Sequence, residues 1–162
     1  SLVAFENSRT GICLTPSQNA VAFCTILEDP RADEIFKNLL FNRNIPIGSR
    51  LYALCGVYWT DPEVFDESLD VFRHSDKIVT RTVGCVGLQN FPVKEIINDI
   101  EWGAHQTSLL EFSKNPKYIE IYTEWLRMRG LPDRRPGPDK DELGRSIPRP
   151  LGHPRRPWRT RQ

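Results

Sequence analysis

Apolar side chains recur every three to four positions through most of residues 1–129, which is the spacing of one face of an α-helix. This pattern predicts five to six short helices, over about 15–27, 32–41, 51–59, 62–75, 92–103 and 116–129. Its clearest stretch is Val93, Ile96, Ile97 and Ile100, at positions i, i+3, i+4 and i+7. We therefore expect a mostly α fold in which the helices share one core, stacked as helical hairpins or in a HEAT-like manner.

Polar residues and glycines predict where these helices begin and end. Thr15 and Asp61 each precede a proline, so each side chain can accept a hydrogen bond from a free backbone N–H while the proline opens the first turn. Gly103 and Gly130 follow the last apolar positions of two helices and predict their ends. Residues 45–49 predict a break in the chain, and residues 108–113 predict a short turn of helix or a loop.

Residues 77–87 differ in kind from the helical segments. They are rich in β-branched side chains, with glycines clustered towards their end. Such a composition favours an extended segment or one arm of a short hairpin.

The formal net charge of +1 hides an uneven distribution of charge along the chain. From residue 130 onward nine basic residues stand against four acidic ones, so residues 1–129 are net negative. Seven prolines in the same region remove backbone hydrogen-bond donors. We therefore expect a helical globular domain over residues 1–129 and a basic, disordered or polyproline-II tail over residues 130–162.

The tail contains the sharpest local motif, with candidate partner-binding residues Pro154, Pro157, Trp158 and Arg159. The pattern Pro-x-x-Pro-x-Arg is the one that SH3-type domains bind as a polyproline-II helix with one cation. The same arginines could instead contact phosphates of nucleic acid, with Trp158 stacked on a base. Basic proline-rich ends commonly serve only as linkers, so of the three alternatives an inert tail is favoured, then a protein partner, then nucleic acid.

Four cysteines occur, at positions 13, 24, 55 and 85, and none are in Cys-x-x-Cys spacing. This spacing argues against a zinc ribbon or a thioredoxin-type redox site. Cys55 and Cys85 are the first choice for a disulfide, because each lies beside a glycine in an apolar stretch. The alternative is that all four are reduced and buried as small apolar side chains.

Asp66, Asp70 and His74 are spaced i, i+4 and i+8, so one helix face would offer two carboxylates and an imidazole to a metal ion. The simpler interpretation is the solvated side of an amphipathic helix, and we favour it. His105 follows a predicted helix end, where an imidazolium would be stabilised by the helix dipole. We therefore expect neither a metal ion nor another cofactor.

The aromatic residues at helical spacing predict core rather than a ligand pocket: Tyr52, Tyr58, Trp59, Phe65 and Phe72. Trp102 and Trp125 stand near helix ends and are expected to be partly exposed. An exposed tryptophan is typical of a binding surface.

Residues 47–65, 83–85 and 92–103 resemble small bacterial proteins of unassigned function. The resemblance rests on Gly48, Tyr52, Leu54, Gly56 and Tyr58, followed by a later Gly-Cys at positions 84 and 85. It implies no activity, because no member of the group has an assigned reaction.

The motifs of common hydrolases, zinc proteases and nucleotide-binding enzymes do not occur in the sequence. We therefore expect a helical interaction domain without a catalytic role and with an unknown protein partner. The alternatives are a small exported enzyme or metal binder built on residues 62–75, and weak nucleic-acid binding through the tail. No apolar run is long enough to span a membrane, and the start at Ser1 gives a slight preference for export.

Overall fold

A computed structural model describes residues 5–6, 9–10, 15–82 and 87–135. The contacts within the chain divide it into two units, Ser1–Pro132 and Asp133–Gln162. The helices and strands all belong to the first unit.

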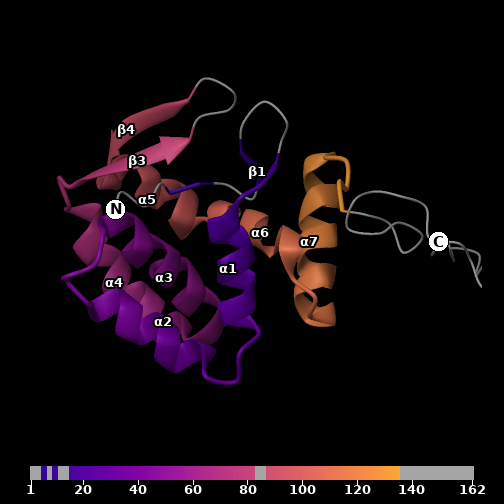
Figure 1. The fold of residues 1–162 in the computed structure, drawn as a ribbon, viewed down its shortest axis with the longest axis horizontal. Coiled ribbons are helices and arrows are strands. Elements are labelled where there is room, and N and C mark those ends of the chain that lie inside the picture. Colours follow the sequence, from indigo (N-terminus) through magenta and orange to yellow (C-terminus); the bar gives the residue numbers. More distant parts are fainter. Residues whose placement is uncertain (1–4, 7–8, 11–14, 83–86, 136–162) are drawn as a thin grey trace, which may run out of the picture. The chain divides into compact units, whose positions relative to one another are not determined.

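The described residues form seven α-helices, one short 3-10 helix and four short strands, which confirms the mostly α fold (Figure 1). The helices are α1 (Gln18–Leu27), α2 (Ala32–Phe41), α3 (Ile47–Thr60), α4 (Pro62–Arg73), α5 (Val93–Glu101), α6 (Ala104–Leu109) and α7 (Pro116–Arg129), with the 3-10 helix η1 (Leu110–Phe112). The strands are β1 (Arg9–Thr10), β2 (Thr15–Pro16), β3 (Ile78–Thr82) and β4 (Leu88–Pro92).

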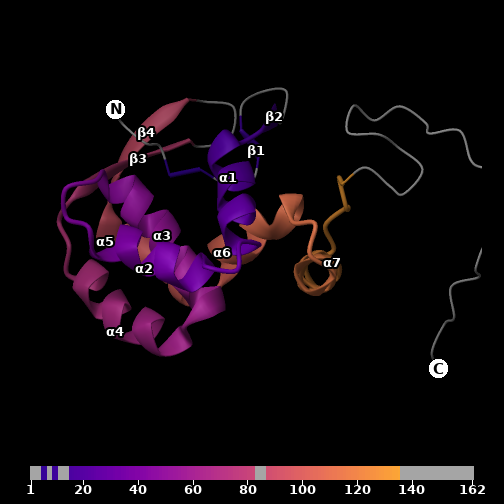
Figure 2. The ribbon, with the colours of Figure 1, turned by 60° about the horizontal axis from the view of Figure 1, so that its bottom comes forward.

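Helix α3 is the centre around which the first unit is built (Figure 2). It packs against α1, α2, α4, α6 and β3. It buries apolar side chains around its whole circumference, as expected for the most apolar stretch of the chain: Leu51, Tyr52, Ala53, Leu54, Cys55 and Val57. The core extends from this helix into every other helix and includes Phe5 and Val79.

Gly56 lets α2 and α3 approach closely. A Cβ atom at this position would lie 2.3 Å from the ring of Phe36, which is buried on α2. The glycine is therefore required by packing rather than by backbone conformation.

The helix starts agree only in part with those predicted from the sequence. Asp61 caps α4 as predicted, because its carboxylate accepts the Val64 N–H at 3.2 Å. The cap of α1 is Ser17 and not Thr15, since Pro16 lies in β2 and the Ser17 hydroxyl accepts the Ala20 N–H. Helix α3 begins at Ile47 directly after Pro46, so the predicted break is shorter than residues 45–49.

The extended segment predicted over residues 77–87 is confirmed for 78–82, which form β3, whereas 83–86 lie outside the described residues. Strand β3 pairs with β4 in an antiparallel hairpin from Ile78 opposite Pro92 to Thr82 opposite Leu88. Strands β1 and β2 form a second, shorter antiparallel pair. On its other edge β3 receives the chain's beginning: Phe5 forms a parallel bridge to Arg81 and donates its N–H to the Thr80 carbonyl at 2.8 Å.

Residues 104–112 are more regular than predicted, since they form α6 and η1 instead of a single turn or loop. Gly103 ends α5 as predicted and also starts α6, with a left-handed φ of 74° that favours glycine.

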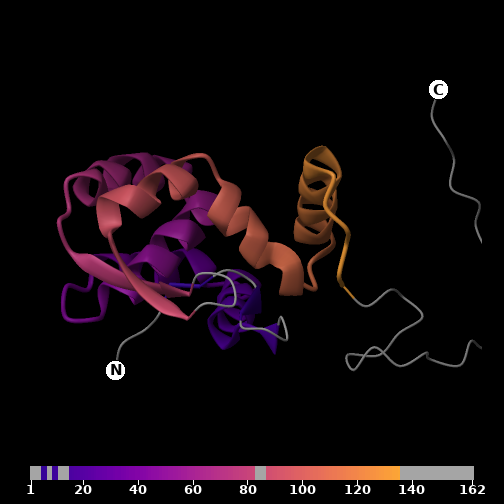
Figure 3. The same cartoon turned by 90° about the horizontal axis from the view of Figure 1, so that it is seen from above.

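Helix α7 lies at one end of the first unit and packs on α6 and η1 (Figure 3). It ends at Gly130, whose φ of 62° confirms the predicted stop. Glu28 joins the end of α1 to the start of α7, because its Oε1 accepts from the Ser113 hydroxyl and the Lys114 N–H, both at 2.6 Å.

Candidate protein-interaction surface

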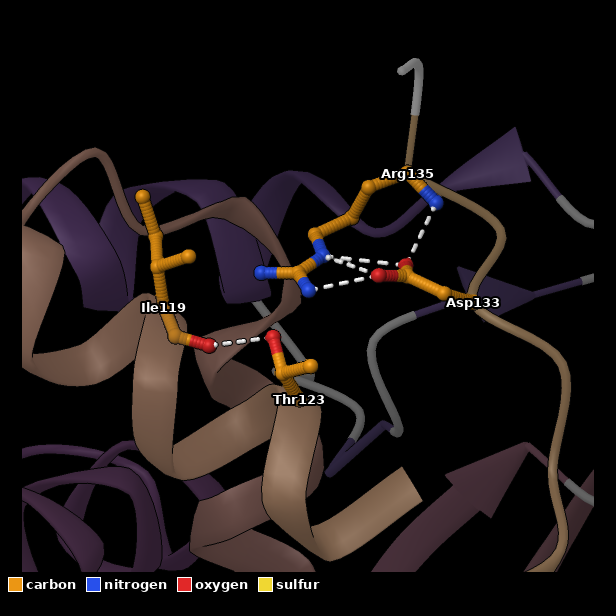
Figure 4. A network of polar contacts seen from close by, with 4 residues as sticks. All are labelled: Ile119, Thr123, Asp133 and Arg135. Carbon is orange, nitrogen blue, oxygen red and sulfur yellow. Dashed lines mark hydrogen bonds and ion pairs between the residues drawn. The ribbon is translucent and has the colours of Figure 1, made fainter. Parts of the chain in front are cut away.

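The tail residues named as candidates lie outside the described residues, because Pro154, Pro157, Trp158 and Arg159 belong to the stretch 136–162. The described beginning of the second unit shows one pairing, in which the Arg135 guanidinium donates to the Asp133 carboxylate at 2.6 Å (Figure 4). The Arg135 hydrogen bond holds the pKa of Asp133 below its usual value. Figure 4 also shows a contact within α7, where the Thr123 hydroxyl donates to the Ile119 carbonyl at 2.7 Å.

Two of the four cysteines are described, and both are buried free thiols. Cys24 donates from its Sγ to the Leu109 carbonyl at 3.0 Å, and burial raises its pKa to about 12. Cys55 lies in the core on α3, and burial raises its pKa as well. Cys13 and Cys85 lie outside the described residues. Because the Cys55 thiol is free, the structure does not contain the predicted Cys55–Cys85 disulfide, and the alternative of reduced, buried cysteines holds for the two that are described. Because protonated thiols are poor nucleophiles and metal ligands, neither described cysteine is suited to catalysis or metal binding.

Asp66, Asp70 and His74 lie on the exposed side of α4, as the amphipathic interpretation expects. Asp70 pairs with Arg73 at 3.1 Å, and His74 Nδ1 lies 3.0 Å from the Asp70 carbonyl oxygen of its own helix. Among the residues that the structure describes, no group of three or more His, Cys, Asp or Glu side chains is placed to hold a metal ion.

The predicted capping role of His105 is wrong. Its side chain is 3% exposed, lies inside the unit on α6 and stacks on Phe5 with ring centroids 4.0 Å apart. Burial, with a smaller contribution from the nearby Arg81 charge, lowers the pKa of His105 to about 3. The imidazole is therefore neutral at physiological pH and cannot act as a helix-capping cation.

Trp102 is the most exposed large apolar side chain of the described residues, at 84%. Its backbone is fixed at the junction of α5 and α6, which we call the Trp102 corner (residues 101–103). The Trp102 N–H donates to the Asn98 carbonyl at 3.2 Å, and Gly103 follows with its left-handed backbone. A side chain on Gly103 would also meet the Tyr58 hydroxyl, since a Cβ would lie 2.8 Å from that oxygen. The indole is thus displayed on a rigid support.

An ion pair braces the Trp102 corner against α4. Arg73 donates to the Glu101 carboxylate as well as to that of Asp70. The hydrogen bond that Arg73 donates to Asp70, with the charge and hydrogen bond of Glu101, raises the pKa of Arg73. This ion pair holds Glu101, the residue before Trp102, against α4, while the indole itself stays exposed.

The two helices next to the corner expose an excess of negative charge. Helices α4 and α5 pack against each other, and their exposed sides carry seven carboxylates against two basic groups of their own, Arg73 and Lys94, while Arg81 of β3 pairs with Asp99 at 3.2 Å. The carboxylates belong to Glu63, Asp66, Glu67, Asp70, Glu95, Asp99 and Glu101. An uncovered indole beside acidic helices can take a partner that presents apolar surface and positive charge.

The sequence indicated part of this surface. The position of Trp102 after a helix predicted exposure, and the structure confirms it. Partial exposure was also expected of Trp125, and it is half-buried, stacked against Tyr122 and beneath the Arg129 guanidinium. The acidic sides of α4 and α5 were predictable from the sequence, because acidic residues occupy the positions opposite the apolar stripe of each helix.

Neither the lengths of the helices nor similarity to known proteins indicates what binds this surface. Among the described residues no helix is both long and apolar enough to cross a bilayer. The resemblance to small bacterial proteins is untested and stays a prediction. No protein-family model, no curated protein and no solved structure matches this chain.

Proposed function

We propose that this chain is a helical protein-interaction domain without a catalytic role, which binds a protein partner through the Trp102 corner and the acidic sides of α4 and α5. The observation that carries the proposal is the 84% exposure of Trp102 on a fixed backbone. Tryptophan is enriched among the residues that dominate binding energy, and covering an exposed indole removes much apolar area from water.

The charge around the corner supports a partner with basic side chains. Seven exposed carboxylates on α4 and α5 attract positive charge and orient an approaching partner. A guanidinium placed over the indole would combine this attraction with a cation–π contact. Binding should therefore weaken as salt concentration rises.

The test is affinity capture by the full chain from an extract of the cells that make it, comparing wild type with Trp102→Ala. We expect Trp102→Ala to lose the captured partner at least tenfold while melting at the wild-type temperature, since the indole contributes little to the core. Phe41→Ala is the matched control, because Phe41 is also an exposed aromatic side chain, at 62%, but lies on α2, outside the proposed surface. Equal recovery with Trp102→Ala and wild type would contradict the proposal.

The tail belongs to the same proposal as a second contact to the partner. Its candidate residues are Pro154, Pro157, Trp158 and Arg159, in the Pro-x-x-Pro-x-Arg pattern. A peptide of residues 150–162 should bind an SH3-type domain, and Pro154→Ala with Pro157→Ala should abolish that binding. If a chain that ends at Pro132 captures as much partner as the full chain, the tail does not contribute to partner binding.

A further inference from the structure

Phe5 and Glu6 are bound by the rest of the chain as a peptide is bound by a receptor. Their partners come from four separate elements: Ser17 and Asn19 at the start of α1, Tyr52 on α3, Thr80 and Thr82 on β3, and His105 on α6. We call this set the Phe5–Glu6 site. It is separate from the Trp102 corner.

The backbone of the segment is recognised by hydrogen bonds that any extended peptide could make. Phe5 donates its N–H to Thr80 and forms a parallel bridge to β3. Tyr52 contacts the peptide units on both sides of Glu6, because its hydroxyl oxygen accepts the Glu6 N–H at 2.7 Å and its O–H donates to the Glu6 carbonyl at 3.1 Å. Addition of an extended segment to a sheet edge is a common mode of peptide recognition.

The aromatic side chain of the segment is fully enclosed. Phe5 is 0% exposed, stacks on His105 with centroids 4.0 Å apart and contacts Tyr52 with centroids 5.0 Å apart. The site therefore selects a flat aromatic ring at this position.

The acidic side chain is recognised by three donors. Glu6 Oε2 accepts from the Ser17 hydroxyl at 2.8 Å and from the Asn19 amide at 3.3 Å, and Oε1 accepts from the Thr82 hydroxyl at 3.2 Å. Two of these donors stand at the start of α1, where the helix dipole also favours negative charge. The site thus specifies an aromatic residue followed by an acidic one.

We infer that the Phe5–Glu6 site is a peptide-binding site that accepts an extended aromatic–acidic segment of a partner protein, added in parallel to β3. The chain's own Phe5 and Glu6 occupy it in the isolated protein and must be displaced. The identity of the ligand follows from this occupant, because the occupant's backbone, ring and carboxylate are each matched by groups of the site.

The test uses the full chain carrying Phe5→Ala and a fluorescein-labelled peptide of residues 2–8, Leu-Val-Ala-Phe-Glu-Asn-Ser. Fluorescence anisotropy should show saturable binding, with an apparent Kd at least about tenfold lower than for wild type, in which the segment competes. Peptides with alanine in place of the phenylalanine, or lysine in place of the glutamate, should bind at least about tenfold more weakly. Equal binding of the altered peptides would overturn the inference, as would no saturable binding to a folded Phe5→Ala chain.

A second variant covers the case in which Phe5→Ala does not fold, which circular dichroism would reveal. Glu6→Gln keeps the buried ring in place and weakens only the carboxylate contacts. Its apparent Kd for the peptide should fall below that of wild type, and an unchanged Kd would overturn the inference. Adding Tyr52→Phe to either variant should weaken peptide binding, because the backbone of the peptide loses both contacts to the hydroxyl.

Light scattering distinguishes the source of the segment. A monomeric wild-type chain supports a partner protein as the ligand, whereas a dimer that dissociates with excess peptide would assign the site to the segment of a second copy and overturn the inference. Trp102→Ala should leave peptide binding unchanged, so failure of the Trp102 proposal would not affect this result.

Discussion

At the scale of single residues, Gly56 shows how one missing methyl group sets the distance between two helices. Alanine would favour the helix by about 1 kcal/mol over glycine, but its Cβ would collide with the buried Phe36 ring at 2.3 Å. Overpacking of this kind costs about 1–3 kcal/mol and outweighs the gain in helix propensity. We predict that Gly56→Ala lowers the free energy of unfolding by about 1–2 kcal/mol, measured by urea denaturation.

Gly130 provides the matched control for this prediction, since a Cβ atom there would have no neighbour within 4 Å and only the left-handed φ of 62° matters. Asparagine tolerates that conformation, so Gly130→Asn should change the free energy of unfolding by less than about 0.5 kcal/mol. A destabilisation of equal size at both glycines would contradict the packing argument.

His105 predicts a pH dependence of stability. Its pKa is about 3 in the folded chain, whereas in the unfolded chain it has the ordinary value of 6.5. Between these values the unfolded state binds a proton that the folded state does not, so stability falls as the pH falls below 6.5. The free energy of unfolding should decrease by about 1 kcal/mol per pH unit between pH 6 and pH 5.

The measurement is urea denaturation of wild type and His105→Phe at both pH values. Phenylalanine keeps a flat ring against Phe5 but has no proton to bind, so most of the slope should disappear. Carboxylates with lowered pKa, such as Glu28, add to the slope only below this window. An identical slope in the two proteins would show that His105 is not the group responsible.

Residue roles divide into those that a local pattern predicts and those that it does not. Asp61 as a cap and Trp102 as an exposed indole follow from their neighbours in sequence. The roles of Phe5 and Glu6 depend on contacts to residues 11 to 100 positions away. The spacing of apolar residues along the sequence carries no information about such distant contacts. The prediction for His105 failed for the same reason, because its position near a helix end says nothing about the Phe5 ring that covers it.

At the scale of elements, α7 has less support from the rest of the first unit than α3 has. It packs on α6 and η1 and buries Tyr118, Tyr122 and Leu126, whereas α3 is enclosed by five elements. Local opening requires less free energy where less apolar surface is buried. In hydrogen exchange followed by mass spectrometry, amides of α7 should therefore exchange faster than those of α3, and equal protection would contradict this prediction.

Glu28 offers a way to alter α7 from another element. Burial raises the pKa of Glu28, but hydrogen bonds from Ser113, Lys114 and Asn115 outweigh this effect and lower it. Glu28→Gln keeps the size of the side chain but weakens its hold on these donors. We expect faster exchange in α7 with unchanged exchange in α3, and Ser113→Ala should act in the same direction.

The elements themselves were largely predictable, because buried helices impose a period of 3.6 residues on their apolar positions. Helices α2, α4, α5 and α7 agree with the predicted segments to within a few residues. Strand β4 and helix α6 were not predicted. Leu88 to Asn90 are exposed and lack alternation, and α6 is only six residues long with buried polar side chains such as Gln106.

At the scale of the whole molecule, the buried core ends at Leu126, within the first unit. A chain that ends at Pro132 should therefore fold alone and melt within about 2 °C of the full chain, since no core residue is removed. Differential scanning calorimetry checks this prediction. A large loss of melting temperature on truncation would show that the second unit contributes to the stability of the first.

The place of Phe5 in the core has a consequence for the order in which the protein forms during synthesis. Its ring packs on His105, so Phe5 stays without its stacking partner until a hundred more residues have been added to the chain. Ribosomes add about 5–20 residues per second, so this interval lasts about 5–20 s. During this interval the Phe5 ring of the nascent chain lacks its His105 partner and can be bound by chaperones, until α6 has been synthesised and covers it.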